Sequence, residues 1–249
     1  MALVATQRVL IIGGGGGIGS AVARQLASEG QQIFLAGRDT SKLAAVAAAT
    51  GAATAEVDAT DFSAAEAVAD QAVADLGGLT GIVCCAGSLL LKPAHLTSAE
   101  EWQATLAANL TTAFACVRTA GRVLKATGGS VVLVSSAAAR IGLANHEAIA
   151  AAKAGILGLV KSAAATYARS RIRFNAVAPG LVKTPLAHGI TSNELATKAS
   201  VGMHPLGRLG EPEDVARAIA FLLDPANDWM TGQVLGVDGG LADLKARSG

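Results

Sequence analysis

Aromatic side chains are scarce in this sequence, and tyrosine is nearly absent. Aromatic residues make up 3% of the 249 residues, and Tyr167 is the one tyrosine. Charged residues are also few, at 16%, and almost cancel to a net charge of +1. A nucleic acid or an anionic membrane surface is therefore not an expected partner.

Other absences narrow the class of protein further. Three cysteines, of which Cys84 and Cys85 are adjacent, make no disulfide framework and suit a reducing compartment. The N-terminus shows no signal-peptide pattern, and we see no apolar run of membrane-spanning length. We expect a cytoplasmic protein that uses no metal.

Glycine and apolar residues are what the chain has in plenty: 29 residues are Gly and 51% are hydrophobic. The apolar run Val9–Ile12 predicts a buried strand, and the glycines Gly13–Gly17 follow at once. Ile18, Val22 and Leu26 then recur at helical spacing. A strand, a glycine turn and a helix together place backbone N–H groups against a phosphate, with no Cβ to block its approach. These flanking signals favour a dinucleotide-binding turn over a flexible glycine linker.

Strand and helix patterns alternate along the rest of the chain. Because no linker divides the chain, we expect one domain over residues 1–249. Its expected fold is a doubly wound parallel sheet with helices on both faces. Capping boxes are predicted at Ser63–Glu66 and Ser98–Glu101. Residues 183–209 have little periodicity and are interpreted as a substrate lid, with a disordered surface loop as the alternative. After the first strand, strands are predicted at Gln32–Ala36, Ala53–Val57, Leu79–Cys85, Ser130–Ser135, Arg171–Val177 and Gln233–Val237. After the first helix, helices are predicted at Ser41–Ala49, Ser63–Leu76, Ser98–Lys125, His146–Arg169 and Pro212–Leu223.

The end of the second predicted strand bears on the choice of cofactor. An acid there would accept the ribose 2′-hydroxyl of NAD, whereas a basic residue suits the 2′-phosphate of NADP. The strand ends in Ala36-Gly37-Arg38, so Arg38 is the candidate phosphate ligand and NADP is favoured over NAD. An ion pair between Arg38 and the neighbouring Asp39 is the alternative.

Ordered motifs along nearly the whole chain give it a family resemblance. They are GGGGGIG (13–19), VDATD (57–61), CCAG (84–87), VSS ending at Ser136, AAAKAGILGL around Lys153, APGLVKT (178–184) and TGQVLGVDGG (231–240). The chain resembles the short-chain dehydrogenase/reductase family. The resemblance implies a homotetramer, with the helices after Ser98 and His146 forming one subunit interface and the last strand another. It also implies that a nicotinamide cofactor contacts Gly13, Gly16, Gly17, Ile18, Gly19, Arg38, Asp58, Ala59, Ala86, Gly87, Lys153, Pro179, Gly180, Val182 and Thr184.

The sequence departs from this family at the catalytic unit Tyr-x-x-x-Lys. Four residues before Lys153 stands Ile149, which exchanges no proton. The family's mechanism uses a phenol whose pKa is lowered by the neighbouring Lys⁺. Asn109, Ser136 and Lys153 match the other positions, and the resemblance assigns to them a water relay, carbonyl polarisation and ribose binding, respectively.

Two other side chains are candidates for the missing acid. Tyr167 lies fourteen residues beyond Lys153, about 21 Å along the same predicted helix, and is too far away. His146 lies three residues before Ile149 on the same face, and histidine is a residue type that can exchange a proton at physiological pH. The alternative is that His146 only decorates the first turn of that helix. Cys84 and Cys85 are interpreted as small buried residues at a strand end, with a reactive thiol as the alternative.

Three functions follow from these residues. The first is an NADP(H)-dependent oxidoreductase whose proton comes from His146, water or the substrate; reduction of an activated C=C bond would depend least on the tyrosine. The second is a nucleotide-binding sensor or partner subunit without turnover, and the third is non-redox chemistry such as dehydration or isomerisation. Asn109, Ser136, Lys153 and Thr184 favour the first. No residue identifies the small-molecule substrate.

Overall fold

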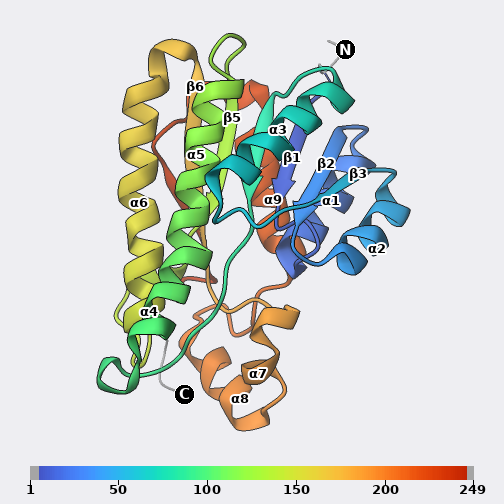
Figure 1. Cartoon of the computed structure of the whole chain (residues 1–249). Coiled ribbons are helices and arrows are strands. Elements are labelled where there is room, and N and C mark those ends of the chain that lie inside the picture. The colour runs from blue at the N-terminus through green and yellow to red at the C-terminus, as the bar shows by residue number, and fades with distance from the viewer. Residues whose placement is uncertain (1–5, 246–249) are drawn as a thin grey trace.

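The computed structural model describes residues 6–245, and its centre is a parallel sheet of seven strands in the order β3-β2-β1-β4-β5-β6-β7. Every pair of neighbouring strands is parallel, which confirms the doubly wound sheet (Figure 1). The strand order reverses between β1 and β4, where a crevice opens at the carboxyl ends of the strands. The strands are β1 (Arg8–Ile12), β2 (Gln32–Gly37), β3 (Ala53–Glu56), β4 (Gly81–Cys84), β5 (Gly129–Val134), β6 (Ile172–Pro179) and β7 (Val234–Val237).

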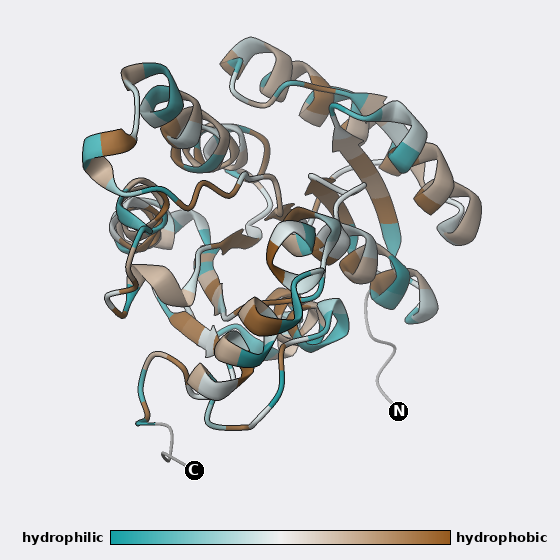
Figure 2. Cartoon of the chain, turned by 90° about the horizontal axis from the view of Figure 1, so that it is seen from below, coloured by the Kyte–Doolittle hydropathy of each residue, from teal (hydrophilic) through white to brown (hydrophobic). Residues whose placement is uncertain are grey.

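Helices cover both faces of the sheet. One layer contains α1 (Gly17–Ser28), α2 (Thr40–Thr50) and α9 (Pro212–Leu223). The other contains α3 (Phe62–Leu76), α4 (Ala99–Leu106), α5 (Thr112–Val123) and α6 (Glu147–Tyr167). Figure 2 shows the apolar strands between these two layers.

Side chains of β1 alternate between two hydrophobic cores. Val9 and Ile11 pack with the layer of α1, α2 and α9, whereas Leu10 and Ile12 pack with the opposite layer. A strand buried on both faces needs such a continuous apolar run. The run before the glycine turn therefore specifies the central strand.

The predicted capping boxes have different outcomes. Ser98 and Glu101 form theirs at the start of α4, as predicted. The prediction for Ser63 and Glu66 is wrong. Asp61 caps α3 instead, accepting from the backbone N–H groups of Ser63 and Ala64 at 2.8 and 3.1 Å, so that the helix begins at Phe62.

The helix predicted over Ser98–Lys125 is not continuous. A π-helical turn over Ala107–Thr111 separates α4 from α5. The Asn109 side chain lies in this turn and donates to the Thr105 carbonyl at 2.9 Å. Such a turn inserts an extra residue into a helix and is frequent at functional sites.

The longest helix bears on the expected absence of a membrane-spanning segment. Glu147–Ser170, which comprises α6 and one following turn, is long and apolar enough to cross a membrane by length and composition, so that expectation is wrong on length. In the structure this helix packs on β6, α4 and α5, and 44% of its most apolar stretch is buried. The core helix of a soluble protein has the same properties.

Within the segment interpreted as a lid, the chain forms two short helices. They are α7 (His188–Thr191) and α8 (Glu194–Met203), which lie below the carboxyl ends of the strands (Figure 1). At its base, Lys183 pairs with Glu211 at 2.6 Å.

Candidate active site

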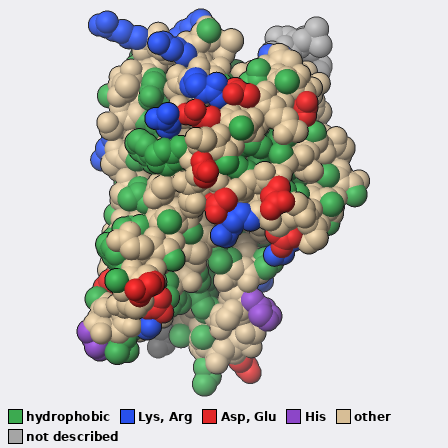
Figure 3. Space-filling model, in the orientation of Figure 1, with side chains coloured by type: hydrophobic (Ala, Val, Ile, Leu, Met, Phe, Trp, Pro, Cys, Tyr) green, Lys and Arg blue, Asp and Glu red, His purple; other side chains and the backbone are tan. Residues whose placement is uncertain are grey.

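A cleft of about 420 Å³ opens at the carboxyl ends of β1, β2 and β4. Figure 3 shows basic and acidic side chains gathered over this end of the sheet, above the lid helices. Ten of the fifteen residues predicted to contact the cofactor line the cleft: Gly13, Gly16, Gly17, Ile18, Arg38, Asp58, Ala59, Ala86, Gly87 and Thr184.

The glycine turn forms the floor of the cleft. Gly13 has a φ of +81°, and a Cβ there would lie 2.5 Å from the Ala86 nitrogen, so a larger residue does not fit. Helix α1 begins at Gly17 with no side-chain cap on its N-terminal N–H groups. Because uncapped N–H groups and the helix dipole attract anions, this cradle fits the pyrophosphate of a dinucleotide.

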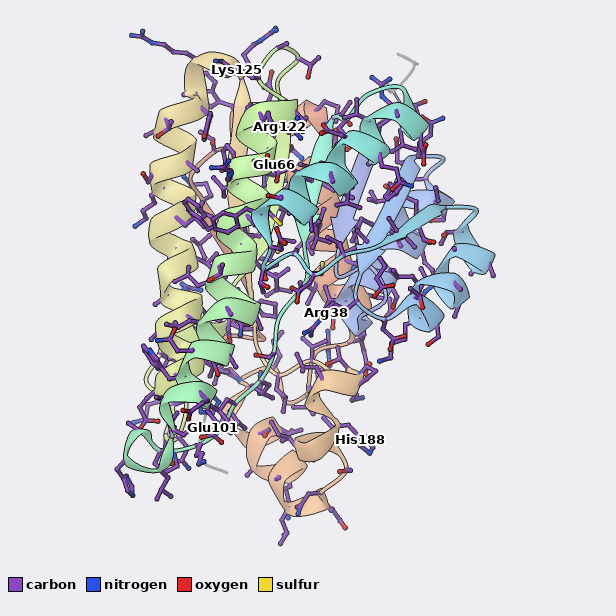
Figure 4. The ribbon with its side chains drawn as sticks, in the orientation of Figure 1. Arg38, Glu66, Glu101, Arg122, Lys125 and His188 are labelled. Atoms are coloured by element: carbon purple, nitrogen blue, oxygen red, sulfur yellow. The ribbon has the colours of Figure 1, made fainter. Side chains whose placement is uncertain are left out.

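Charged residues gather where β2 ends. Asp39 is occupied as the cap of α2: it accepts from the Lys42 N–H and the Ser41 hydroxyl and pairs with the Lys42 ammonium at 2.8 Å. These hydrogen bonds, the one from the Lys42 side chain first, hold the pKa of the Asp39 carboxyl well below its usual range. Arg38 forms no ion pair with Asp39 or any other described residue. Figure 4 shows Arg38 between the sheet and the lid helices.

Asp58 lines the same cleft as the glycine turn. It accepts from the Thr60 N–H at 3.0 Å and from the Thr60 hydroxyl at 2.8 Å. These bonds, the backbone one first, lower the pKa of Asp58. The carboxylate is thereby held ionised and oriented.

Five of the predicted cofactor residues do not line the cleft, namely Gly19, Lys153, Pro179, Gly180 and Val182. Gly19 packs against the Gly13 carbonyl, so its role is close contact between the turn and the helix. Pro179 ends β6, and Val182 is buried and pairs with Gly210. Gly180 lines a second cavity of about 380 Å³ beside His204. Of the motif over residues 178–184, Thr184 is the predicted contact that reaches the cleft, and it packs on Gly17.

Asn109 and Lys153 meet behind Gly87. A Cβ at Gly87 would lie 2.8 Å from Asn109 Oδ1 and 3.4 Å from Lys153 Nζ. Lys153 Nζ donates to the Val134 carbonyl at 2.9 Å, and Asn109 Nδ2 donates to the Ser88 hydroxyl at 3.0 Å. Burial lowers the pKa of Lys153 to about 8. The structure thus brings two of the four predicted catalytic residues together.

None of the four predicted catalytic residues is among those that line the cleft, and Ser136 and His146 have contacts of their own. The Ser136 hydroxyl accepts from the Ala138 N–H at 3.1 Å, at the end of β5. The His146 ring contacts the Ala144 carbonyl at 2.7 Å, just before α6. Ile149 is 3% exposed and lies one helical turn before Lys153. Tyr167 stands at the far end of α6, where its ring packs on Phe174.

Two cysteines at the end of β4, Cys84 and Cys85, lie near Lys153. Cys84 is buried, and Cys85 contributes to the cleft wall. Burial raises the pKa of the Cys85 thiol well above its usual range. The Cys85 thiol is therefore protonated, which supports its interpretation as a small packing side chain, whereas the hydrogen bond from Cys116 lowers the pKa of Cys84.

Sequence reasoning missed several residues of the cleft. Lys42 adds a second cation beside Arg38, and Ala108 and Thr112 approach from the π turn and α5. Lys42 follows its cap Asp39 by three residues, and this spacing could have indicated that it lies on the first turn facing the cleft. Nothing in the sequence marked the π turn.

The comparisons with known proteins agree with this geometry. A family model described as "Enoyl-(Acyl carrier protein) reductase" matches residues 13–242. The cis-4-hydroxycyclohexanecarboxylate dehydrogenase of Sinomonas cyclohexanicum is 40% identical over 241 residues, 94% of this chain and 96% of that protein. The trans-4-hydroxycyclohexanecarboxylate dehydrogenase of the same organism is 34% identical, over 95% of this chain and 93% of that one. The crystal structure of levodione reductase superposes with a TM-score of 0.90 at 29% identity, covering 96% and 98% of the two chains.

A parallel sheet with a phosphate cradle at its switch point defines a dinucleotide-binding oxidoreductase fold. The chain belongs to the short-chain dehydrogenase/reductase family. It is accordingly an oxidoreductase of that type, which acts on a small molecule and uses a nicotinamide cofactor.

Proposed function

We propose that this protein is an NADP(H)-dependent dehydrogenase that interconverts a small alicyclic secondary alcohol and its ketone. The observation that carries the choice of NADP is the cation at the end of β2. Arg38 lines the cleft without an ion-pair partner among residues 6–245, whereas the acid beside it, Asp39, is occupied in capping α2. A planar guanidinium suits a 2′-phosphate, which it binds through two N–H groups.

Each part of the dinucleotide has a matching group in the cleft. The uncapped start of α1 would hold the pyrophosphate, Arg38 and Lys42 the 2′-phosphate, and Asp58 the adenine. Lys153, beside Gly87, would reach the nicotinamide ribose. The nicotinamide, when bound, supplies or accepts the hydride.

Ile149 occupies the position that we assign to the family's tyrosine. It lies one turn before Lys153 on α6, and side chains four residues apart share a helix face. The proton of the reaction must therefore come from another group. Asn109 would orient water or a substrate hydroxyl beside Lys153, since its side chain is fixed by Ser88 and Thr105.

The substrate class comes from the relatives. Two of them are named for dehydrogenation of a hydroxylated cyclohexanecarboxylate, and both align over more than nine-tenths of this chain. These names favour a ring carbinol over the activated C=C bond considered above. The lid contributes Leu186 to the cleft, an apolar side chain suited to contact with a ring.

We also propose that the protein is a cytoplasmic homotetramer, and two exposed faces support the assembly. Trp102 on α4 and Phe114 on α5 are 37% and 46% exposed, and Leu235 on the edge strand β7 is 37% exposed. Large apolar side chains on an unpaired edge and on neighbouring helices are typical of subunit interfaces.

Nucleotide titration of the purified protein tests the cofactor proposal. NADPH should bind more tightly than NADH by about 1.5–3 kcal/mol, and Arg38→Ala should remove most of that difference. Arg24→Ala, on the outer side of α1, is the matched control for loss of a surface arginine. Equal affinities for the two nucleotides in the wild-type protein would contradict the proposal. Binding without turnover on any ring alcohol or ketone would instead favour a sensor or partner subunit.

A further inference from the structure

The amine of Lys153 is buried behind Gly87, a residue of the cleft wall, with few acceptors around it. Its side chain is 8% exposed, and the Val134 carbonyl is the acceptor that it reaches among residues 6–245. An ammonium has three N–H donors. Two of them are left for water or for a molecule bound beside Gly87.

No carboxylate compensates this charge in the described part of the chain. The titratable groups that face the amine are the thiols of Cys84 and Cys85, at the end of β4. The other elements packed around it present neutral groups, namely Asn109 from the π turn and the Ser135 hydroxyl, which donates to the Lys153 carbonyl. Burial therefore governs its ionisation and lowers the pKa of Lys153 to about 8.

The helix face beside the amine carries no competing proton donor. Ile149 occupies the preceding turn and is apolar and buried. His146 lies outside the helix, with its ring on the Ala144 carbonyl. An amine with a pKa near 8 populates both protonation states near neutral pH, which is the requirement for a general acid and base.

We propose that the Lys153 amine itself exchanges the proton with the substrate oxygen, where the family relies on a tyrosine. The inference rests on the proposed dehydrogenase function. In alcohol oxidation the substrate O–H bond breaks and the proton joins the lone pair of Nζ. The hydrogen on the carbinol carbon leaves as the hydride that the nicotinamide accepts, and the C=O bond forms. The resulting ammonium releases the proton to water; ketone reduction runs the same transfers in reverse.

The variant Lys153→Arg distinguishes proton exchange by Lys153 from its positive charge and its binding of the nicotinamide ribose. A guanidinium keeps the positive charge and the N–H donors but does not deprotonate in proteins. We expect the NADPH affinity of the variant to stay within about fivefold, and kcat for oxidation of a ring alcohol such as cyclohexanol to fall by about 10²–10⁴-fold. The wild-type rate of alcohol oxidation should rise with pH up to about 8 and then level off. The residual rate of Lys153→Arg should not show this rise. Lys161→Arg, on the exposed side of α6, is the control.

A variant with a smaller side chain keeps the test valid if arginine disturbs folding. Lys153→Ala should regain activity with added methylamine, and the rescue should follow the concentration of the free amine rather than of methylammonium. Rescue that follows the ammonium form would show that charge alone is needed and would overturn the proposal.

A measurement on the protein without cofactor completes the design. NMR of protein labelled with 15N at the lysine Nζ should show one amine that titrates near pH 8 and disappears in Lys153→Arg. The inference is wrong if every lysine titrates near the ordinary value of 10.5. It is also wrong if the pH dependence of the rate persists in Lys153→Arg and vanishes in His146→Asn. A failure of the proposed function is distinct, because it would appear as loss of nucleotide binding in the wild-type protein.

Discussion

Replacing Lys153 by Met should make the protein more stable at neutral pH. The buried ammonium has its pKa lowered from 10.5 to about 8, so the folded state binds its proton less tightly than the unfolded chain does. At 1.36 kcal/mol for each pKa unit, the charged form costs about 3 kcal/mol of folding free energy. Loss of the hydrogen bond to the Val134 carbonyl offsets about 1 kcal/mol, which leaves a gain of about 2 kcal/mol.

The sign of this difference should change with pH. Below pH 8 both states of the wild-type protein are protonated, and the full cost is present. Between pH 8 and 10.5 the unfolded chain binds more protons than the folded one, so the stability of the wild-type protein rises relative to Lys153→Met. Above that range the wild-type protein should be the more stable by about 1 kcal/mol, because the neutral amine keeps its hydrogen bond.

Urea unfolding of both proteins across this pH range measures the difference directly. Lys161→Met, which removes an exposed lysine from the same helix, controls for the loss of a surface charge. The reasoning would be refuted if the difference in unfolding free energy between wild type and Lys153→Met were constant with pH. It would also be refuted if the variant were the less stable protein at neutral pH. Such a result would mean that the amine is solvated in the folded protein.

Three further perturbations test other parts of the account. Arg173→Met should destabilise the protein by about 3 kcal/mol in urea unfolding, because the guanidinium binds the carbonyls of Leu222, Leu223 and Asp224 where α9 ends; an unchanged midpoint would exclude this role. Ile149→Tyr should raise the rate of ketone reduction by less than the roughly 10²–10⁴-fold of a full acid–base group, since Lys153 already supplies the proton; no gain from a folded variant would mean that a phenol does not reach the substrate there. Light scattering should give four times the monomer mass of 24.7 kDa, and the monomer mass at micromolar concentration would contradict the tetramer.

The fold was predictable because its signals are local. One strand–turn–helix unit is specified by a four-residue apolar run, a glycine turn and the helical spacing of Val22 and Leu26. Strands and helices go on alternating along the chain, and this alternation leaves little choice of topology. The cap of α3 was mispredicted because Asp61 and Ser63 both suit an N-cap, and the sequence does not show which residue starts the helix.

Features that depend on tertiary packing were out of reach. The π turn that positions Asn109 has no sequence signal, since its residues are ordinary helix formers. The family motif identified Lys153, but its altered ionisation depends on burial, which only the folded chain shows. Gly180 and Val182 share a motif with Thr184, but neither is among the residues that line the cleft, and Gly180 lies beside His204.

Turnover of a ring alcohol tests the central claim most directly. The assay mixes the wild-type protein with a ring alcohol, either cyclohexanol or a 4-hydroxycyclohexanecarboxylate. It contains either NADP⁺ or NAD⁺, and the absorbance of the reduced nicotinamide is followed with time. The account predicts formation of reduced nicotinamide without any tyrosine near the site, faster with NADP⁺, at a rate that rises with pH up to about 8. No reduced nicotinamide with either nucleotide, from protein that binds NADPH, would contradict it.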